Sequence, residues 1–168
     1  MNPYLLPALE LGPVIFERLL DHIPRSQLDV SLIEGRFTPR EIMAHLADWE
    51  PIMRGRIETA CLDPGSSLAV YDEGEMAIEN EYSSSDIHEQ CGIFRRERRI
   101  TAELARSLTP EAWGQSVSHP ERGMLTTEDL TNLLLGHDLY HIEQLSAYLP
   151  FPTGNHPQSD EQTTDELP

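Results

Sequence analysis

The chain has 168 residues and a formal net charge of −17 at pH 7, and this length suits one domain with a single core. Such an acidic protein lacks the basic surface that phosphate binding requires, so we expect no nucleic-acid partner. All 12 basic residues are arginine. Because lysine is absent, Schiff-base chemistry and a P-loop are excluded.

The sequence carries no secretory signal pattern at its start and no apolar run long enough to cross a bilayer. We therefore expect a cytoplasmic protein without a membrane partner. Two cysteines, Cys61 and Cys91, are too few and too far apart for a disulfide scaffold or a CxxC zinc site. We expect both thiols to be reduced and mostly buried.

Helical periodicity predicts a first helix over residues 3–22, kinked or restarted at Pro13. The second predicted helix has a strong start signal, because Thr38 can cap it and Glu41 can close a capping box. Apolar residues recur along this second helix at close to a 3.6-residue period. His45 lies within that apolar stripe.

Residues 62–84 form a predicted loop that is too long to be a simple connector. Loops of this length often cover a site, so Tyr71 and Asp72 are candidate residues at its mouth. The alternative for both residues is a place in an ordinary polar loop that covers no site. Ser85 then offers a cap for a third helix that ends near Leu108.

The third predicted helix carries the one basic cluster of the chain. We expect it to be a solvated face that pairs with acidic neighbours, rather than an anion-binding site. The cluster consists of Arg95, Arg96, Arg98 and Arg99.

Residues 109–125 contain Pro110, Pro120 and Gly123 and are expected to be irregular. Thr126 or Thr127 caps a fourth predicted helix, with acidic residues in its first turn. This helix carries His137 and His141 on its apolar face and ends at the prolines that follow it.

Four amphipathic helices predict an all-α protein, an antiparallel four-helix bundle with room for one long crossover. We assign residues 1–152 to this domain. Residues 153–168 are polar and acidic with almost no apolar anchors, so they are expected to form a disordered tail.

Positions i and i+4 of a helix share one face, so His137 and His141 can converge on a single metal ion. Helical H-E-x-x-H zinc sites use the same spacing, but no glutamate lies between these two histidines. His45, on the inward stripe of another helix, could complete a three-histidine set. Since buried imidazoles need partners, the pattern favours a shared metal over three separate core histidines.

Three neutral imidazoles suit zinc, nickel, copper or ferrous iron and leave a coordination position open. Asp48 and Asp138 each lie one turn from a histidine and are candidates to orient a ligand ring, with an exposed salt bridge as the alternative. Gln144 could hydrogen-bond a ligand or the substrate, or cap a core position.

The remaining histidines and the nearby glutamates are expected on the surface. These residues are His22, His88 and His156, together with Glu50 and Glu143, which are turned away from the histidine face. His119 precedes a proline in a loop. It could line a pocket, but solvent exposure is the preferred interpretation.

The segment TPREIMAHLADWE, followed about ninety residues later by GMLTTEDLTNLLLGHDLYHIEQL, resembles the DinB-like superfamily. The resemblance covers about residues 10–149. It implies an up-up-down-down four-helix bundle, usually dimeric, with a divalent metal held by His45, His137 and His141. Family members with assigned roles mostly act on low-molecular-weight thiols, as S-transferases or as a thiol-dependent isomerase.

We rank first a metal-dependent enzyme that binds a small thiol as its thiolate and transfers it to an electrophile. Arg54 or Arg56 could attract an anionic thiol, although ordinary surface charge is the preferred interpretation. The second possibility is a hydrolase with metal-activated water, for which Asp48 or a loop carboxylate would act as the base.

A third possibility is a non-enzymatic dimeric bundle in which the metal is structural or serves as a sensor. A fourth ligand from the 62–84 loop, such as Asp72, would support it, because structural zinc sites are normally closed. For either enzyme we expect a small-molecule substrate and a homodimer, with zinc, nickel or iron as the metal.

Overall fold

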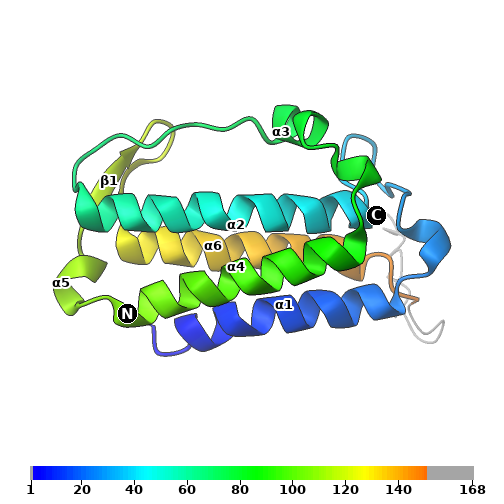
Figure 1. The fold of residues 1–168 in the computed structure, drawn as a ribbon, viewed down its shortest axis with the longest axis horizontal. Helices are drawn as coiled ribbons and strands as arrows, with labels where there is room; N and C mark the ends of the chain where they lie inside the picture. Colours follow the sequence, from blue (N-terminus) through cyan, green and yellow to red (C-terminus); the bar gives the residue numbers. More distant parts are fainter. Residues whose placement is uncertain (1, 151–168) are drawn as a thin grey trace, which may run out of the picture.

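The computed structural model describes residues 2–150, in which four long helices form a bundle (Figure 1). The elements, in chain order, are α1 Leu5–His22, a 3-10 turn Arg25–Gln27, α2 Pro39–Leu62, α3 Glu73–Glu79, a 3-10 turn Tyr82–Ser84, α4 Ile87–Ser107, α5 Pro110–Trp113, β1 Ser116–His119, β2 Gly123–Thr126 and α6 Thr127–Ser146. The predicted all-α four-helix bundle is confirmed. The predicted tail of residues 153–168 lies outside the described residues.

The four long helices form two parallel pairs. Figure 1 shows α1 and α6 running in one direction and α2 and α4 in the other. Both α1 and α2 pack against α4 and α6, whereas α1 and α2 lie diagonally across the bundle from each other. Around the bundle the directions therefore read up-up-down-down, whereas the resemblance implied that order along the chain. In chain order they read up-down-down-up.

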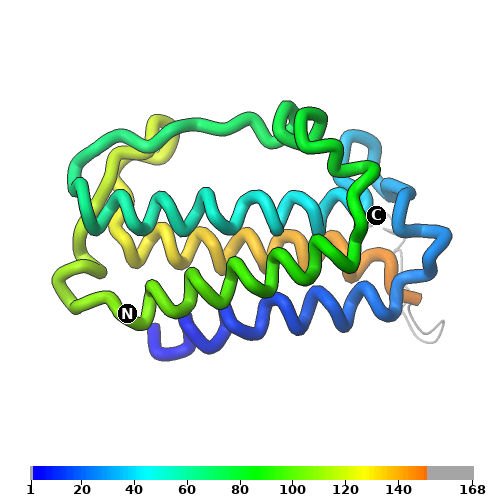
Figure 2. The backbone as a smooth tube through the Cα atoms, viewed as in Figure 1, coloured from blue at the N-terminus to red at the C-terminus, as the bar shows by residue number. Residues whose placement is uncertain are grey.

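Because α2 and α4 are parallel, the chain must return along the whole bundle between them. The tube in Figure 2 shows this crossover running beside α2 before the chain enters α4. The crossover is more ordered than the predicted loop, since it contains α3 and a 3-10 turn. Asp72 caps α3 by accepting bonds of 2.9 Å from the backbone N–H groups of Gly74 and Glu75. Tyr82, only 1% exposed, anchors the end of the crossover in the core.

The expectation of irregular structure over residues 109–125 was wrong. Pro110 opens the short helix α5, and β1 and β2 then pair as an antiparallel hairpin in which His119 faces Gly123. Gly123 has a φ of +74°, a backbone conformation that suits glycine at the hairpin turn. Val117 is fully buried, so one face of this hairpin belongs to the core. Thr126 ends β2 and caps α6, as predicted.

The starts of the helices show how well capping residues in the sequence predicted where each helix begins. The predicted capping box of α2 is present, with Thr38 and Glu41 bonded reciprocally. The predicted cap of α4 was one residue out, because Asp86 and not Ser85 accepts the free N–H groups. α1 continues through Pro13 without a restart.

The apolar core runs the length of the bundle and is closed at one end by the hairpin. Near that end Ile57 and Leu130 pack with Val117, and near the other end Phe16 packs edge-on against Phe94. No helix in the described part of the chain is long and apolar enough to span a membrane.

Candidate metal centre

Three histidines from two helices converge in the interior of the bundle. His45 on α2 and His141 on α6 are buried, and His137 on α6 is half-buried. The Nε2 atom of His137 lies 2.9 Å from that of His45 and 3.1 Å from that of His141. One ring nitrogen from each residue lies within 4.8 Å of the other two. The structure therefore brings together the three residues that the sequence had grouped.

Gln144 fixes the protonation of one ring. Its Oε1 lies 2.7 Å from Nδ1 of His141, so that nitrogen carries the proton and donates it. The Nε2 of His141 is then left with a lone pair aimed at the other histidines. A ligand-orienting hydrogen bond of this kind is typical of metal-binding imidazoles, and Gln144 had been a candidate for it.

Burial keeps all three imidazoles neutral. Desolvation, with a smaller contribution from His141, lowers the pKa of His45 to about 3. The pKa of His137 falls to about 2 for the same reason, with smaller effects from the neighbouring histidines. Burial also lowers the pKa of His141 to about 4, partly opposed by the bond to Gln144. Neutral imidazole is the form that binds metal ions.

The residues present fit a divalent cation better than they fit one another. A ring nitrogen can satisfy only one neighbour, yet Nε2 of His137 meets two. The Nδ1 atoms of His45 and His137 are buried without a partner. With metal–nitrogen distances of about 2.0–2.1 Å, two ligand nitrogens lie roughly 3 Å apart, as these do. A cation that accepts the three Nε2 lone pairs would satisfy the converging nitrogens, and the Nδ1 atoms of His45 and His137 would carry the ring protons.

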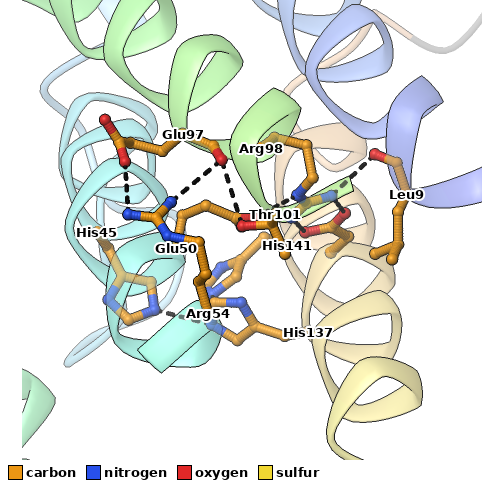
Figure 3. Close-up of polar contacts among 10 residues, drawn as sticks. Leu9, His45, Glu50, Arg54, Glu97, Arg98, Thr101, His137 and His141 are labelled. Atoms are coloured by element: carbon orange, nitrogen blue, oxygen red, sulfur yellow. Dashed lines mark hydrogen bonds and ion pairs between the residues drawn. The ribbon is translucent and has the colours of Figure 1, made fainter. Parts of the chain in front are cut away.

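Beside the histidines lies a second buried polar cluster, centred on Arg98 of α4 (Figure 3). All five guanidinium N–H groups of Arg98 are used: they bond both oxygens of Glu50, both oxygens of Asp138 and the carbonyl of Leu9. The Arg98 side chain and its two carboxylate partners are each 1% exposed. This cluster links all four long helices.

Three expectations fail at this cluster, two of them for surface positions. Glu50 and Arg98 had been expected in solvent, and Asp138 had been a candidate to orient a histidine. The other three arginines of the basic cluster do pair with acidic neighbours at the surface, as predicted. Arg98 differs because its position on α4 faces the centre of the bundle.

The remaining carboxylate candidates also lie away from the histidine rings. Asp48 accepts a 2.7 Å bond from Asn80 of the crossover, and Nδ1 of His45 stays unpartnered. Asp72 caps α3 and is not part of the cluster. Trp49, which the sequence marked only as an apolar position, stacks on His45 with ring centres 5.5 Å apart.

His137 lines a cavity of about 170 Å³ that opens away from the core. Tyr71, a predicted mouth residue, lines the same cavity, as do Arg56 and Arg122. His119 is only 7% exposed and also lines it, so the preferred interpretation of solvent exposure was wrong. A wider groove of about 680 Å³ adjoins this cavity and shares His137 and Arg122 with it.

The other histidines and the cysteines form no further site among the described residues. His22 and His88 are exposed as predicted, and His156 lies outside the described part of the chain. Cys91 is buried and Cys61 half-buried, and both are free thiols. Burial raises the pKa of Cys91 to about 11, which makes it a poor nucleophile.

A family model described as the DinB superfamily matches residues 8–145. The chain belongs to the DinB superfamily. It is 23% identical over 135 residues to a protein of Oceanobacillus iheyensis, covering 80% of this chain and 78% of the relative. YfiT of Bacillus subtilis is 22% identical over 142 residues, covering 84% of this chain and 80% of the relative. Both relatives are named "Putative metal-dependent hydrolase".

Solved structures show the same fold. The structure of YfiT from Bacillus subtilis matches with a TM-score of 0.80 at 21% identity, over 86% of this chain and 83% of that one. A mycothiol-dependent maleylpyruvate isomerase matches with a TM-score of 0.68 at 16% identity, over 84% of this chain and 59% of that one. The four-helix bundle is therefore shared with proteins that differ widely in sequence.

Proposed function

We propose that His45, His137 and His141 hold a divalent metal ion and that the protein is an enzyme acting on a small thiol at this site. The supporting observation is the convergence of three neutral imidazoles, of which His137 also borders a cavity. Hydrogen bonding among the rings cannot satisfy all three Nε2 atoms, because that of His137 meets two neighbours, and a cation could accept the lone pair of each.

A bound divalent ion would lower the pKa of a coordinated thiol, so that it reacts as the thiolate. The chain's own residues prepare the site for this role. Gln144 holds the ring of His141 with its lone pair turned inward, and Trp49 covers one face of His45. The cavity beside His137 gives a small ligand access to the cluster.

Thiol chemistry is favoured over hydrolysis because it needs no general base for water. Glu50 and Asp138 are both bonded to Arg98, and Asp48 is bonded to Asn80. Among residues 2–150, no carboxylate joins the three histidines. The mycothiol dependence of the isomerase with the same fold also supports a thiol.

Metal-dependent hydrolysis is the second candidate, and the names of the two relatives favour it. It requires metal-activated water in the cavity beside His137. A structural metal has less support, because closed structural sites use four protein ligands and the described residues supply three.

Metal content tests the proposal first. We expect about one divalent ion per chain, measured by elemental mass spectrometry after dialysis against zinc, nickel and iron in turn. His45→Ala should lose it, and the matched control His22→Ala, altered at an exposed histidine, should retain it. Full occupancy in His45→Ala would overturn the ligand assignment.

Cobalt-loaded protein then separates the two chemistries. We expect 2-mercaptoethanol to produce a sulfur-to-cobalt charge-transfer band in the wild type and none in His45→Ala. A wild-type protein that shows no such band but hydrolyses activated esters in a metal-dependent way would favour the hydrolase.

A further inference from the structure

Arg56, on the same face of α2 as His45 and Trp49, has most of its hydrogen-bonding capacity unused. Its Nε–H is buried without a partner. Its other contacts are a 3.4 Å approach of Nη1 to the sulfur of Met53 and a 3.3 Å bond from Nη2 to the carbonyl of Ala69. Among the described residues it forms no ion pair, although this chain is rich in carboxylates and most of its other arginines do.

Two aromatic rings hold this guanidinium at the cavity. Its Cζ atom lies 5.4 Å from the ring centre of Trp49 and 5.8 Å from that of Tyr71. The Trp49 ring centre is in turn 6.2 Å from the ring of His137. The positive charge is therefore held beside Trp49, in the cavity that His137 also lines, within reach of a ligand that contacts His137.

A second cation reaches the same cavity from the hairpin. Arg122, at the turn between β1 and β2, lines both this cavity and the adjoining groove, and it too forms no ion pair with a described residue. Burial lowers the pKa of His119 between them, and the charges of Arg56 and Arg122 add to this effect. Both arginines therefore act on one small region.

Two glutamates, Glu73 and Glu121, also border the cavity, and both are exposed. Neither lies within ion-pair distance of Arg56 or Arg122. The arginines are thus near acidic groups but not neutralised by them, and the fork of Arg56 keeps free donors. A fork with free donors suits a carboxylate, which can accept two parallel N–H bonds.

We propose that Arg56 and Arg122 form an anion subsite that binds the carboxylate of a small ligand whose other end reaches the histidine cluster. The carboxylate site is inferred from the two arginines alone. The contact between the ligand and the histidine cluster rests on the proposed function. The cavity, at about 170 Å³, is smaller than the roughly 300–1,000 Å³ of pockets for drug-sized ligands. The carboxylate-bearing part of the ligand that this cavity holds is therefore small.

The test uses pairs of thiols that differ only in charge. Mercaptocarboxylates of two to six carbons, beginning with mercaptoacetate, are compared with mercaptoalcohols of the same length by titration of the cobalt-loaded protein. We expect the best carboxylate to bind about tenfold more tightly than its alcohol, as a charge-assisted hydrogen bond allows. Non-specific electrostatics predicts the opposite, because the protein carries a net charge of −17.

Substitutions at the two arginines test whether these residues cause the preference for carboxylates over alcohols. In Arg56→Gln and in Arg122→Gln the carboxylate-to-alcohol ratio should fall towards one. In Arg99→Gln, which removes an exposed arginine on α4, the ratio should stay at its wild-type value. An unchanged ratio in both test variants, or a wild type that prefers the alcohol, overturns the inference. If Arg56→Gln fails to fold, Arg122→Gln decides, because that side chain is exposed on a hairpin turn.

A second titration, of succinate into chelator-treated protein followed by calorimetry, separates this inference from the proposed function. Succinate binding that weakens in Arg56→Gln supports the subsite, whether or not a thiol produces a charge-transfer band. The absence of that band with every thiol would contradict only the proposed thiol chemistry. Equal charge-transfer bands with acids and alcohols, and no succinate binding, would leave the thiol site standing and reject the subsite.

Discussion

Two polar clusters are buried side by side in this bundle, and they differ in how fully their hydrogen bonds are satisfied. Around Arg98, every guanidinium N–H meets a carboxylate or a carbonyl oxygen. Around His137, three ring nitrogens crowd together while two others have no partner. The hydrogen bonds of the first cluster are complete within the chain, and those of the second are not.

The difference distinguishes a polar cluster that is satisfied within the protein from one that is open to a ligand. Burying a charge is unfavourable unless it is paired and hydrogen-bonded, and the Arg98 cluster meets that condition in a place that solvent does not reach. The histidine cluster stays neutral, keeps unused lone pairs and borders a cavity. A buried polar group that lacks hydrogen-bond partners and borders a cavity is a candidate for ligand binding.

Removing Arg98 should have the largest effect on stability. Arg98→Met would leave Glu50 and Asp138 buried as unpaired carboxylates, so we expect the free energy of unfolding in urea to fall by about 3–5 kcal/mol. The matched variant Arg99→Met, at an exposed position, should change it by less than about 0.5 kcal/mol. A loss below about 1 kcal/mol in Arg98→Met would mean that the cluster is not buried as described.

Acid should destabilise the metal-free protein through the histidines. The folded-state pKa of His45, about 3, lies below its unfolded value near 6.5, so the unfolded chain binds the proton first as pH falls. The stability contributed by this group is therefore complete above pH 6.5 and is lost between pH 6.5 and about 3, by up to about 1.4 kcal/mol per pH unit.

Urea melts of chelator-treated wild type and His45→Phe at pH 7, 6 and 5 would measure that dependence. Phenylalanine removes the titrating group and keeps an aromatic ring among Phe37, Trp49 and Tyr82. We expect the variant to lose less stability per pH unit than the wild type. Parallel losses would show that His45 does not carry the effect.

Gln144→Ala tests whether the hydrogen bond to His141 prepares the histidine cluster for a metal ion. Without the acceptor at Nδ1, the ring of His141 can turn and change tautomer, so metal affinity should fall about 10- to 100-fold in a competition titration. Glu143→Ala, at the exposed neighbouring position, is the control and should bind metal as the wild type does. Equal affinities for both variants would remove Gln144 from the site.

Two glycine substitutions should act in opposite directions. A Cβ atom at Gly12 of α1 would lie 2.7 Å from Oδ2 of Asp138 and 3.0 Å from Nη1 of Arg98, so Gly12→Ala should destabilise by about 1–3 kcal/mol. Gly92 of α4 has open space, and Gly92→Ala should stabilise by about 0.5–1 kcal/mol through helix propensity. Thermal melts of both variants would show whether α1 packs this closely on the Arg98 cluster.

The histidine cluster was predictable because the spacing of residues along single helices is enough to place each histidine on an inward face. His137 and His141 share a face by their spacing alone, and His45 lies on an apolar stripe with a recognisable capping box before it. Helix periodicity points all three side chains inward, and only a bundle is then needed for them to meet. The same local signals located the four long helices.

The Arg98 cluster and Arg122 were missed for the opposite reason, and Arg56 was named only as an alternative to ordinary surface charge. Glu50 and Asp138 are 48 and 40 residues from Arg98, so their pairing depends on how three helices pack. On one helix alone, each of these residues is indistinguishable from an ordinary surface charge. Arg56 of α2 and His119 of the hairpin line one cavity with Tyr71 of the crossover, and no periodicity encodes the paths of the crossover and the hairpin.

The diagonal placement of neighbouring helices has a consequence for how the chain folds. Helices that follow one another along the chain, α1 with α2 and α4 with α6, lie across the bundle and share little contact surface. No helical hairpin can therefore form early as a stable local unit, and the α2–α4 contact must wait for the crossover to close. Folding rates fall as contacts become less local, so this bundle should fold more slowly than an up-and-down bundle of equal length, in one cooperative step.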